Sequence, residues 1–152
     1  MNRYITIVIG AGLIVAACST PYQSYGFTGG VGSQQLNKRL YKIDAQGNGY
    51  TSRGRIKDYT MLKASEICRE KGFSSFDIVT GQNHTSRSYA STPAHTNCYG
   101  GSCSTYGGGL VAINKPSSSI TVYFYSSSDE VPLTATDCDL IYRQLAQVYI
   151  KK

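Results

Sequence analysis

The sequence predicts a small α+β sandwich, in which a mostly antiparallel sheet of about four strands carries two helices on one face. Two segments with apolar side chains at helical spacing, residues 53–71 and 135–149, predict the helices. Shorter runs of strand-forming residues lie before, between and after them, in an order typical of a two-layer α+β domain. These expected strands cover residues 38–45, 76–80, 110–113 and 120–125.

Turn and cap residues delimit the first of these elements. Residues 38–45 alternate in polarity, so Leu40 and Ile43 are expected to face inward. The turn residues Gly47-Asn48-Gly49 follow, and Ser52 stands directly before the first helix. Gly72 is well placed to end that helix.

Each expected helix has one apolar stripe that should face the core. The first stripe contains Ile56, Tyr59, Ala64 and Ile67, with Leu62 and Cys68 at its edges. The second stripe contains Cys138, Ile141, Tyr142, Leu145, Val148 and Tyr149. Cys68 and Cys138 are therefore expected to face the same core.

A long segment low in apolar residues separates the second and third strands. Residues 82–108 are rich in Ser, Thr, Gly, Asn and Tyr, and we expect them to form a long loop. Loops of this length are usually functional or disordered. The last two strands should form a hairpin through Lys115-Pro116-Ser117-Ser118.

The N-terminus has the features of a bacterial lipoprotein signal peptide. Arg3 precedes an uncharged, mostly apolar run at residues 5–17, which has the length of a signal-peptide core and is too short to span a bilayer. Val15-Ala16-Ala17-Cys18 resembles a lipobox, in which Cys18 supplies the thiol that is alkylated by diacylglycerol. We expect residues 1–17 to be removed and Cys18 to carry acyl chains, palmitate among them. The alternative is an ordinary secretory signal with a chance cysteine.

The expected location follows from this lipid and from the residue beside it. Two or three acyl chains make a durable anchor. Ser19 stands where an Asp would favour retention in the inner membrane, so we expect an outer-membrane anchor with the domain facing the periplasm.

The other cysteines favour disulfides, because an even number in an oxidising compartment is typical of a disulfide framework. Three pairings of Cys68, Cys98, Cys103 and Cys138 are possible. We favour Cys98–Cys103, which closes a tight loop through two glycines, and Cys68–Cys138, which ties the two helices together.

Two other readings of the stretch from His95 to Cys103 remain open. A zinc site would need a fourth ligand, and His84, the only other histidine, lies eleven residues from His95. A nucleophilic Cys98 or Cys103 would need an orienting third group and a rigid cleft. We expect no metal, no cofactor and no catalytic residue here.

Composition argues against nucleic-acid binding and against acid–base catalysis. The net charge of +6 is spread along the chain, and no basic run is longer than a pair such as the terminal Lys151-Lys152. The nine Asp and Glu residues include Asp58, Glu66 and Glu70 on the expected solvated face of a helix. Asp137 and Asp139 suit a helix N-terminus. No motif of an enzyme appears, so we expect a non-enzyme.

Residues 18–36 are uncharged and rich in Gly and Ser, and we expect them to form a flexible tether ahead of a domain at residues 37–152. Aromatic residues in the tether either fold back on the domain or dock on a partner. The expected partner-binding residues are Tyr22, Tyr25 and Phe27 in the tether and Tyr99 and Tyr106 in the loop.

Two stretches together resemble a family of small, uncharacterised proteobacterial lipoproteins. The stretches are ACSTPYQSYGFTGG and GNGYTSRGRIKDYTMLKASEICREKGF, and the likeness covers residues 17–80 well. Members typically have a lipidated Cys followed by Thr-Pro-Tyr-Gln, and a Gly-Asn-Gly-Tyr-Thr-Ser-Arg turn ahead of a helix. The resemblance implies an envelope lipoprotein and supplies no reaction. The Cys-bearing segment from 83 to 109, with Cys68 and Cys138, looks like an addition.

The function expected from these features is that of a non-catalytic structural subunit. The lipid would hold the domain at the outer membrane, where it contacts other envelope proteins in an assembly such as a secretion-system outer-membrane core. The alternative is a periplasmic binding module for a small ligand, a metal or peptidoglycan. The support for that alternative is the pair His84 and His95 in the long loop.

Overall fold

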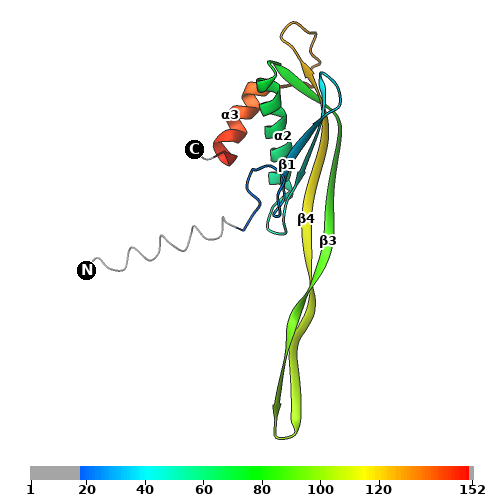
Figure 1. Ribbon diagram of the computed structural model, residues 1–152, viewed down its shortest axis with the longest axis vertical. Helices are drawn as coiled ribbons and strands as arrows, with labels where there is room; N and C mark the ends of the chain where they lie inside the picture. The colour runs from blue at the N-terminus through cyan, green and yellow to red at the C-terminus, as the bar shows by residue number, and fades with distance from the viewer. Residues whose placement is uncertain (1–17, 151–152) are drawn as a thin grey trace, which may run out of the picture.

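The computed structural model describes residues 18–150 and confirms the α+β class (Figure 1). One antiparallel sheet has the strand order β1-β2-β4-β3-β5, and both helices lie on the same side of it. Strands β3 and β4 continue far beyond the rest of the sheet as a two-stranded arm. In chain order the elements are β1 (Gly30–Gln35), β2 (Leu40–Gln46), α2 (Arg53–Glu70), β3 (Ser75–Tyr99), β4 (Ser102–Tyr125), β5 (Thr136–Asp137) and α3 (Cys138–Tyr149).

The core lies between α2 and the sheet, and its centre is aromatic. The ring of Phe124 on β4 lies 5.3 Å from the rings of Tyr41 and Phe73, and 6.1 Å from the ring of Phe76. Phe124 and Phe76 are fully buried. Aromatic pairs at such separations add to the stabilisation that burial of their area provides.

Helix α2 begins at the predicted residue, ends one residue before the predicted end, and has the predicted buried face. The side chain of Ser52 caps it by accepting a hydrogen bond from the backbone N–H of Arg55. Gly72 follows its end with a φ of +77°, a backbone conformation that favours glycine. All six residues of the predicted stripe are buried: Ile56, Tyr59, Leu62, Ala64, Ile67 and Cys68.

Helix α3 begins later than predicted and buries less of its stripe. It begins at Cys138, because the side chain of Asp137 accepts a hydrogen bond from the N–H of Leu140 and so forms the N-cap. Cys138 is its one fully buried residue, and Val148 is 60% exposed. The reason is that α3 packs mainly on α2, so only one side of its stripe is covered.

The predicted loop at residues 82–108 is wrong, and so is the predicted hairpin at residues 115–118. Both segments belong to β3 and β4, which pair in one continuous register from Thr80 opposite Thr121 to Tyr99 opposite Ser102, interrupted only beside Pro93. Polarity suggested a loop, but Thr, Tyr, Val and Ile favour strands, and the partner strand supplies the backbone hydrogen bonds.

The predicted flexible tether at residues 18–36 is also wrong, because this segment folds onto the domain. Residues 30–35 form β1, which pairs with β2 from Gly30 opposite Gln46 to Gln35 opposite Tyr41. Thr20 and Val31 are buried. Gly and Ser content suggested flexibility, whereas tertiary hydrogen bonds hold the segment. The expected signal peptide, residues 1–17, lies outside the described residues.

Both favoured disulfides are confirmed. Cys68 of α2 and Cys138 of α3 are joined with a Cα–Cα separation of 6.2 Å, and Cys98 and Cys103 are joined at 4.0 Å. Arg69, beside Cys68, adds an ion pair with Asp139 at 2.8 Å and lies over the ring of Tyr142. Helix α3 is therefore fastened to α2 covalently and by a charged contact.

Candidate functional site

The first described residues, at the expected lipidation site, are held against the body by the turn ahead of α2. Residues 18–20 and the turn at 47–51 begin the two stretches on which the resemblance was based, 17–30 and 47–73, and here they meet in space. We term the contact the anchor lock, and it consists of residues 18–20, Asn48, Thr51, Arg55 and Tyr59.

Thr20 is the centre of the anchor lock and is fully buried. Its N–H donates to Thr51 Oγ1 at 2.9 Å, and its carbonyl accepts from the hydroxyl of Tyr59 at 2.7 Å. Its own hydroxyl donates to the carbonyl of Thr28 at 2.6 Å and accepts from the N–H of Asn48 at 2.9 Å. Every polar group of this residue is thus satisfied inside the body, as burial requires.

Asn48 connects the lock to the chain at Cys18. Its side-chain amide donates to the carbonyl of Cys18 at 2.7 Å. Its side-chain carbonyl accepts from the N–H of Tyr50 at 3.0 Å and from the hydroxyl of Thr51 at 2.8 Å. Asparagine fits because one short side chain must donate and accept at once.

The glycines that flank Asn48 let the turn lie against its neighbours. A Cβ at Gly47 would stand 2.7 Å from Thr51 Cβ, and a Cβ at Gly49 would stand 2.7 Å from Ile113 of β4. The N–H of Gly47 donates to the carbonyl of Pro116, also on β4, at 2.9 Å. The turn therefore touches residues 18–20 on one side and the base of the arm on the other.

Arg55 of α2 links the anchor lock to Tyr149 of α3. Arg55 donates to the hydroxyl of Ser19, and its guanidinium lies 5.8 Å from the centre of the Tyr149 ring. The hydroxyl of Tyr149 donates to Asp58 at 2.6 Å. Burial, followed by this hydrogen bond, raises the pKa of Tyr149 to about 12, so the phenol stays neutral and remains a donor at physiological pH.

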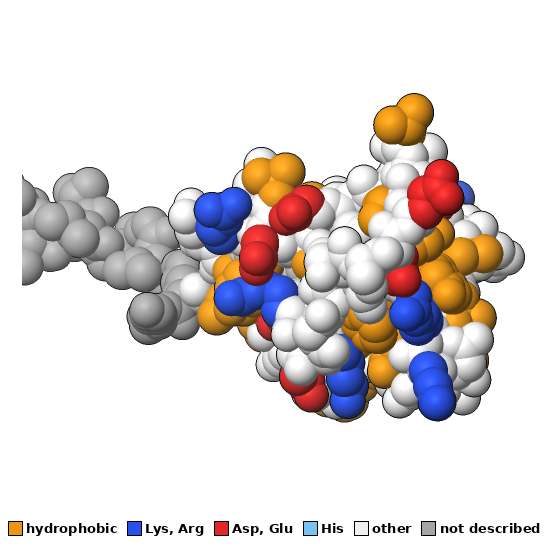
Figure 2. All heavy atoms as spheres, turned by 90° about the horizontal axis from the view of Figure 1, so that it is seen from above, with side chains coloured by type: hydrophobic (Ala, Val, Ile, Leu, Met, Phe, Trp, Pro, Cys, Tyr) orange, Lys and Arg blue, Asp and Glu red, His pale blue; other side chains and the backbone are white. Residues whose placement is uncertain are grey.

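Two of the three carboxylates predicted on the solvated face of α2 instead contact tyrosines, while Glu70 is exposed as predicted. Asp58 binds Tyr149, and Glu66 accepts a hydrogen bond from Tyr22 at 2.8 Å. Burial and the neighbouring Glu66 raise the pKa of Tyr22 far above its usual value. Over the face of the body in Figure 2, basic and acidic side chains are interspersed, and neither sign dominates.

No family model matches this chain, and no curated protein or solved structure matches it either. The candidate site therefore rests on the geometry of the chain itself. None of the helices within residues 18–150 has both the length and the apolar character needed to cross a membrane.

The hairpin arm, residues 85–116, is the second candidate region. Beyond the pairing of Gln46 with Ser117, β3 and β4 have only each other as partners among the described residues. At about 3.4 Å per residue, the fifteen residues from Thr85 to Tyr99 make the arm roughly 50 Å long. Every side chain between Ser86 and Asn114 is exposed except that of Ile113, which is half-buried.

The tip of the arm is rigidly closed. Gly100 and Gly101 have φ values of +59° and +82°, as a tight two-residue turn of a hairpin requires. The Cys98–Cys103 disulfide joins directly opposite residues just behind the turn. Tyr99 at the turn is 93% exposed.

The arm has no hydrophobic core, and hydrogen bonds between side chains link its two strands instead. Thr96 and Thr105 share a hydrogen bond of 2.9 Å, and Asn97 donates to the Tyr106 hydroxyl at 2.8 Å. Near the base, Arg87 donates to Asn114 at 3.2 Å. A two-stranded hairpin without a packed face is marginally stable alone, so the tip disulfide and these bridges matter for its order.

The five expected partner-binding residues lie in two separate places. Tyr22 packs edge-on against Tyr59 at 5.3 Å, so for this residue the alternative of folding back on the domain holds. Tyr25 and Phe27 are exposed, Phe27 fully, on the segment ahead of β1. Tyr99 and Tyr106 are exposed on the arm.

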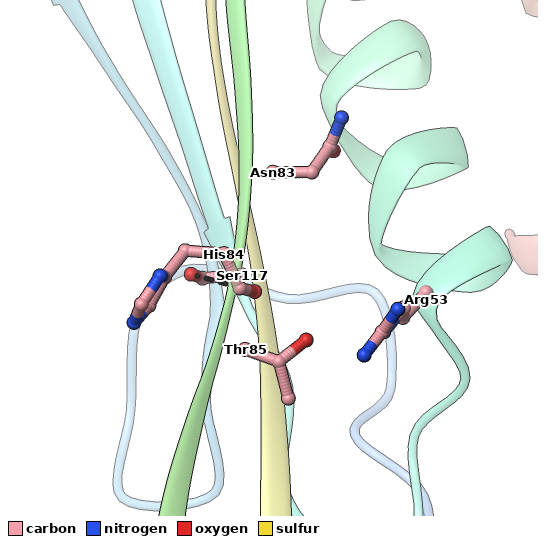
Figure 3. A pocket seen from close by; sticks show the side chains of 5 residues that line it. All are labelled: Arg53, Asn83, His84, Thr85 and Ser117. Carbon is pink, nitrogen blue, oxygen red and sulfur yellow. Dashed lines mark hydrogen bonds between the residues drawn. The ribbon is translucent and has the colours of Figure 1, made fainter.

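The two histidines are not brought together. His84 lies opposite Ser117 and His95 lies opposite Tyr106 on the arm, eleven residues further along one strand, or roughly 37 Å. Figure 3 shows the hollow lined by Arg53, Asn83, His84, Thr85 and Ser117, with the His84 ring turned away from Arg53. Within residues 18–150, no three His, Cys, Asp or Glu side chains gather as a metal site would need. Cys98 and Cys103 are bonded to each other, so neither is a free thiol.

The anchor lock was missed from the sequence, although its residues stand in the two resembling motifs. Gly47-Asn48-Gly49 indicated a turn, but nothing local indicated that its side chain binds residue 18, thirty positions earlier. The co-occurrence of the two motifs was the available signal.

Substituting Asn48 with alanine should release residues 18–20 from the body. Three side-chain hydrogen bonds are lost, and at about 1 kcal/mol each this should lower the free energy of unfolding by roughly 2–3 kcal/mol. Hydrogen exchange should show faster exchange of the Thr20 amide, with little change in β2 and β4. Asn37→Ala is the matched control, because Asn37 caps an exposed turn through two hydrogen bonds of its own. Unchanged protection of Thr20 in Asn48→Ala would contradict the assignment.

Proposed function

We propose that this protein is a non-catalytic structural subunit of an envelope assembly. Acyl chains on Cys18 hold it at the outer membrane, and the domain faces the periplasm. There it contacts other envelope proteins, as a small lipoprotein of a secretion-system outer-membrane core would. The observation that carries the proposal is the hairpin arm, which leaves the body with its side chains exposed on both faces.

The arm supports an interaction role because it contributes nothing to the core of its own chain. The hydrophobic core consists of residues from the body, with none between Thr85 and Lys115. The arm nevertheless exposes large apolar side chains: Tyr89, Tyr99, Tyr106, Leu110 and Val111. Exposed apolar side chains grouped on one projecting element are typical of a contact surface for another protein.

The anchor lock supports the membrane part of the proposal. The side chain of Cys18 is exposed, as lipidation would need, while the carbonyl of the same residue is held by Asn48. Because Thr20, only two residues further, is buried, an acyl anchor on Cys18 would hold the body close to the membrane surface. A subunit mounted in this way would present its arm in a restricted set of directions.

The alternative of a binding module has a weaker structural basis. The hollow in Figure 3 is the place such a module would use, since Arg53, Asn83 and Thr85 offer polar groups there. His84, which suggested the ligand role, points out of it and lines a second, open hollow with Asp44 and Gln82. Ligand pockets usually combine apolar walls with converging polar groups, and this arrangement lacks the convergence.

Deleting the arm tests the proposal. Residues 89–112 are replaced by Asn-Gly, so that Ser88 and Ile113, which are paired, flank a two-residue turn. The body should keep its cooperative unfolding and its Cys68–Cys138 bond, because the deleted residues bury nothing in the core. After mild detergent extraction, the full chain should migrate in a large, defined assembly and the shortened chain as a lone small lipoprotein.

The matched control is Leu133→Ser, which changes a fully exposed apolar residue outside the arm and should leave the assembly intact. Migration of the full chain by itself, or retention of the shortened chain in the assembly, would contradict the proposed function.

A further inference from the structure

Both outer edges of the arm lack a strand partner among the described residues. Strand β2 pairs with β4 only as far as Ser117, and β5 pairs with β3 only at Ser75 and Phe76. From Thr85 to Tyr99 and from Ser102 to Lys115, each strand therefore has one paired edge and one open edge. Open edges present unpaired backbone N–H and C=O groups to any other strand.

These edges have few of the features that prevent pairing with other chains, and the main one is Pro93 in β3, where the pairing is interrupted beside Gly107 and Gly108. Natural edge strands are usually short or carry charged residues, and Lys is the most frequent of these. Here the two edges are long, and Arg87 and Lys115 are the only charged residues between Thr85 and Pro116. The run from Leu110 to Ile113 is apolar, and its first two residues are 73% and 52% exposed. Long, weakly charged strands that contain a short apolar run of this kind pair readily.

The anchor lock would align the arms of neighbouring copies, and this step rests on the proposed function. The turn at residues 47–49 touches Cys18 through Asn48 and the base of the arm through Gly47 and Pro116. Copies lipidated in one membrane would therefore direct their arms the same way. In such a row, β3 of one copy lies beside β4 of the next, and these two strands run antiparallel, as a continued antiparallel sheet requires.

The side chains of the arm are compatible with that arrangement. If neighbouring arms repeat the register of the hairpin, Arg87 stands opposite Asn114 and Ser86 stands opposite Lys115 of the next copy. Like charges directly opposite each other would destabilise the sheet, and this register places none there. The apolar run from Leu110 to Ile113 would lie opposite Ser88–Ser91 of the next copy, where Tyr89 and Ala90 are its apolar neighbours.

We infer that the partner of the arm is a second copy of this chain, with the open edge of β3 in one copy paired to the open edge of β4 in the next. The contact joins two different surfaces, so each copy keeps one edge free for a further copy. Such head-to-tail contacts build rings or open rows. The arms would thus form one continuous sheet above the lipid anchors.

Cysteine cross-linking in the full lipidated chain tests this pairing. Ser91→Cys and Leu110→Cys are made in separately tagged chains that are produced together, because residues 91 and 110 are opposite in the hairpin register. After mild oxidation we expect mixed dimers, well above dimers of either chain alone. Mass spectrometry of the linked peptides distinguishes the new bond from exchange with Cys98–Cys103. Tyr50→Cys with Leu133→Cys is the control pair, exposed but outside the arm, and should give none.

A single charge on one edge supplies a second measurement. Val111→Lys places a lysine on the open β4 strand and should reduce the 91–110 cross-link to the level of the control pair. Leu133→Lys adds the same charge away from the arm and should leave the cross-link unchanged. Unaltered thermal unfolding of the body would show that Val111→Lys acts on pairing and leaves the fold intact.

The outcomes separate this inference from the proposed function. Absence of mixed dimers overturns the pairing of β3 with β4. The same holds if chains carrying Ser91→Cys alone give as much dimer as the mixture of the two chains. Cross-links from the arm to a different envelope protein overturn the second copy as partner and leave the proposed function standing. A lone chain in native extracts, with no cross-link from the arm, overturns both.

Discussion

Replacing Cys18 with alanine should remove the protein from the outer membrane and leave its fold intact. The thiol is the only atom group at this residue that can receive diacylglycerol, and the acyl chains would supply the whole of the membrane affinity, at about 0.8 kcal/mol for each buried CH₂. The anchor lock should survive, because Asn48 binds the backbone carbonyl of residue 18, which alanine retains. The expected loss of outer-membrane association is therefore complete, and the expected loss of stability is small.

Fractionation of membranes together with intact-protein mass spectrometry measures this effect. The variant should lack the acyl mass and should not sediment with outer-membrane lipid, while its thermal unfolding matches that of a delipidated wild-type domain. Ser19→Ala is the control, since it removes one hydrogen bond, that with Arg55, and retains the thiol at 18. Recovery of Cys18→Ala in the outer membrane with an unchanged acyl mass would refute the lipid anchor.

Removing the Cys68–Cys138 bond should be the most destabilising change to the body. The bond closes a loop with a sequence separation of 70, and constraint of an unfolded loop of that length contributes about 4 kcal/mol. Both cysteines are buried, so alanine is the replacement of choice because it adds no polar group to the core. Cys68→Ala with Cys138→Ala should lower the midpoint of thermal unfolding by roughly 10–20 °C for a domain of this size.

The second disulfide provides a control within the same chain. Cys98→Ala with Cys103→Ala opens a loop with a sequence separation of 5, which contributes about 2 kcal/mol at most. That loss falls on the arm, which has no part in the core, so the body should unfold at nearly its original temperature. Equal shifts of the unfolding midpoint in the two double variants would contradict the division into a body and an independent arm.

The position of α2 could be predicted because its signals lie within one short segment. The disulfides could be predicted because four cysteines allow only three pairings. Helix α2 follows from its apolar stripe, from the cap at Ser52 and from the stop at Gly72, and all three act within one helix. The pairing of Cys68 with Cys138 follows from two stripes that must face one core. The α+β class follows from the same patterning.

The hairpin arm and β1 could not be predicted, because their signals are not local. Residues 82–108 have the polarity of a loop, and only the opposite strand makes them β structure. Strand β1, with its sequence GVGSQQ, owes its conformation to β2 rather than to its own composition. In both cases a distant partner satisfies the backbone hydrogen-bonding groups, and a single segment gives no indication of that partner.

The sequence by itself therefore determined the fold class, the first helix, the pairing of the four cysteines and the expectation of a lipid on Cys18. Only the tertiary structure decided that residues 18–20 are fixed to the body through Asn48 and Thr51, and that β3 and β4 project as one arm. The physical reason is the range of the interactions. Helix stripes and caps act over a few residues, whereas the anchor lock joins residues about thirty positions apart and the base of the arm joins Thr85 to Pro116.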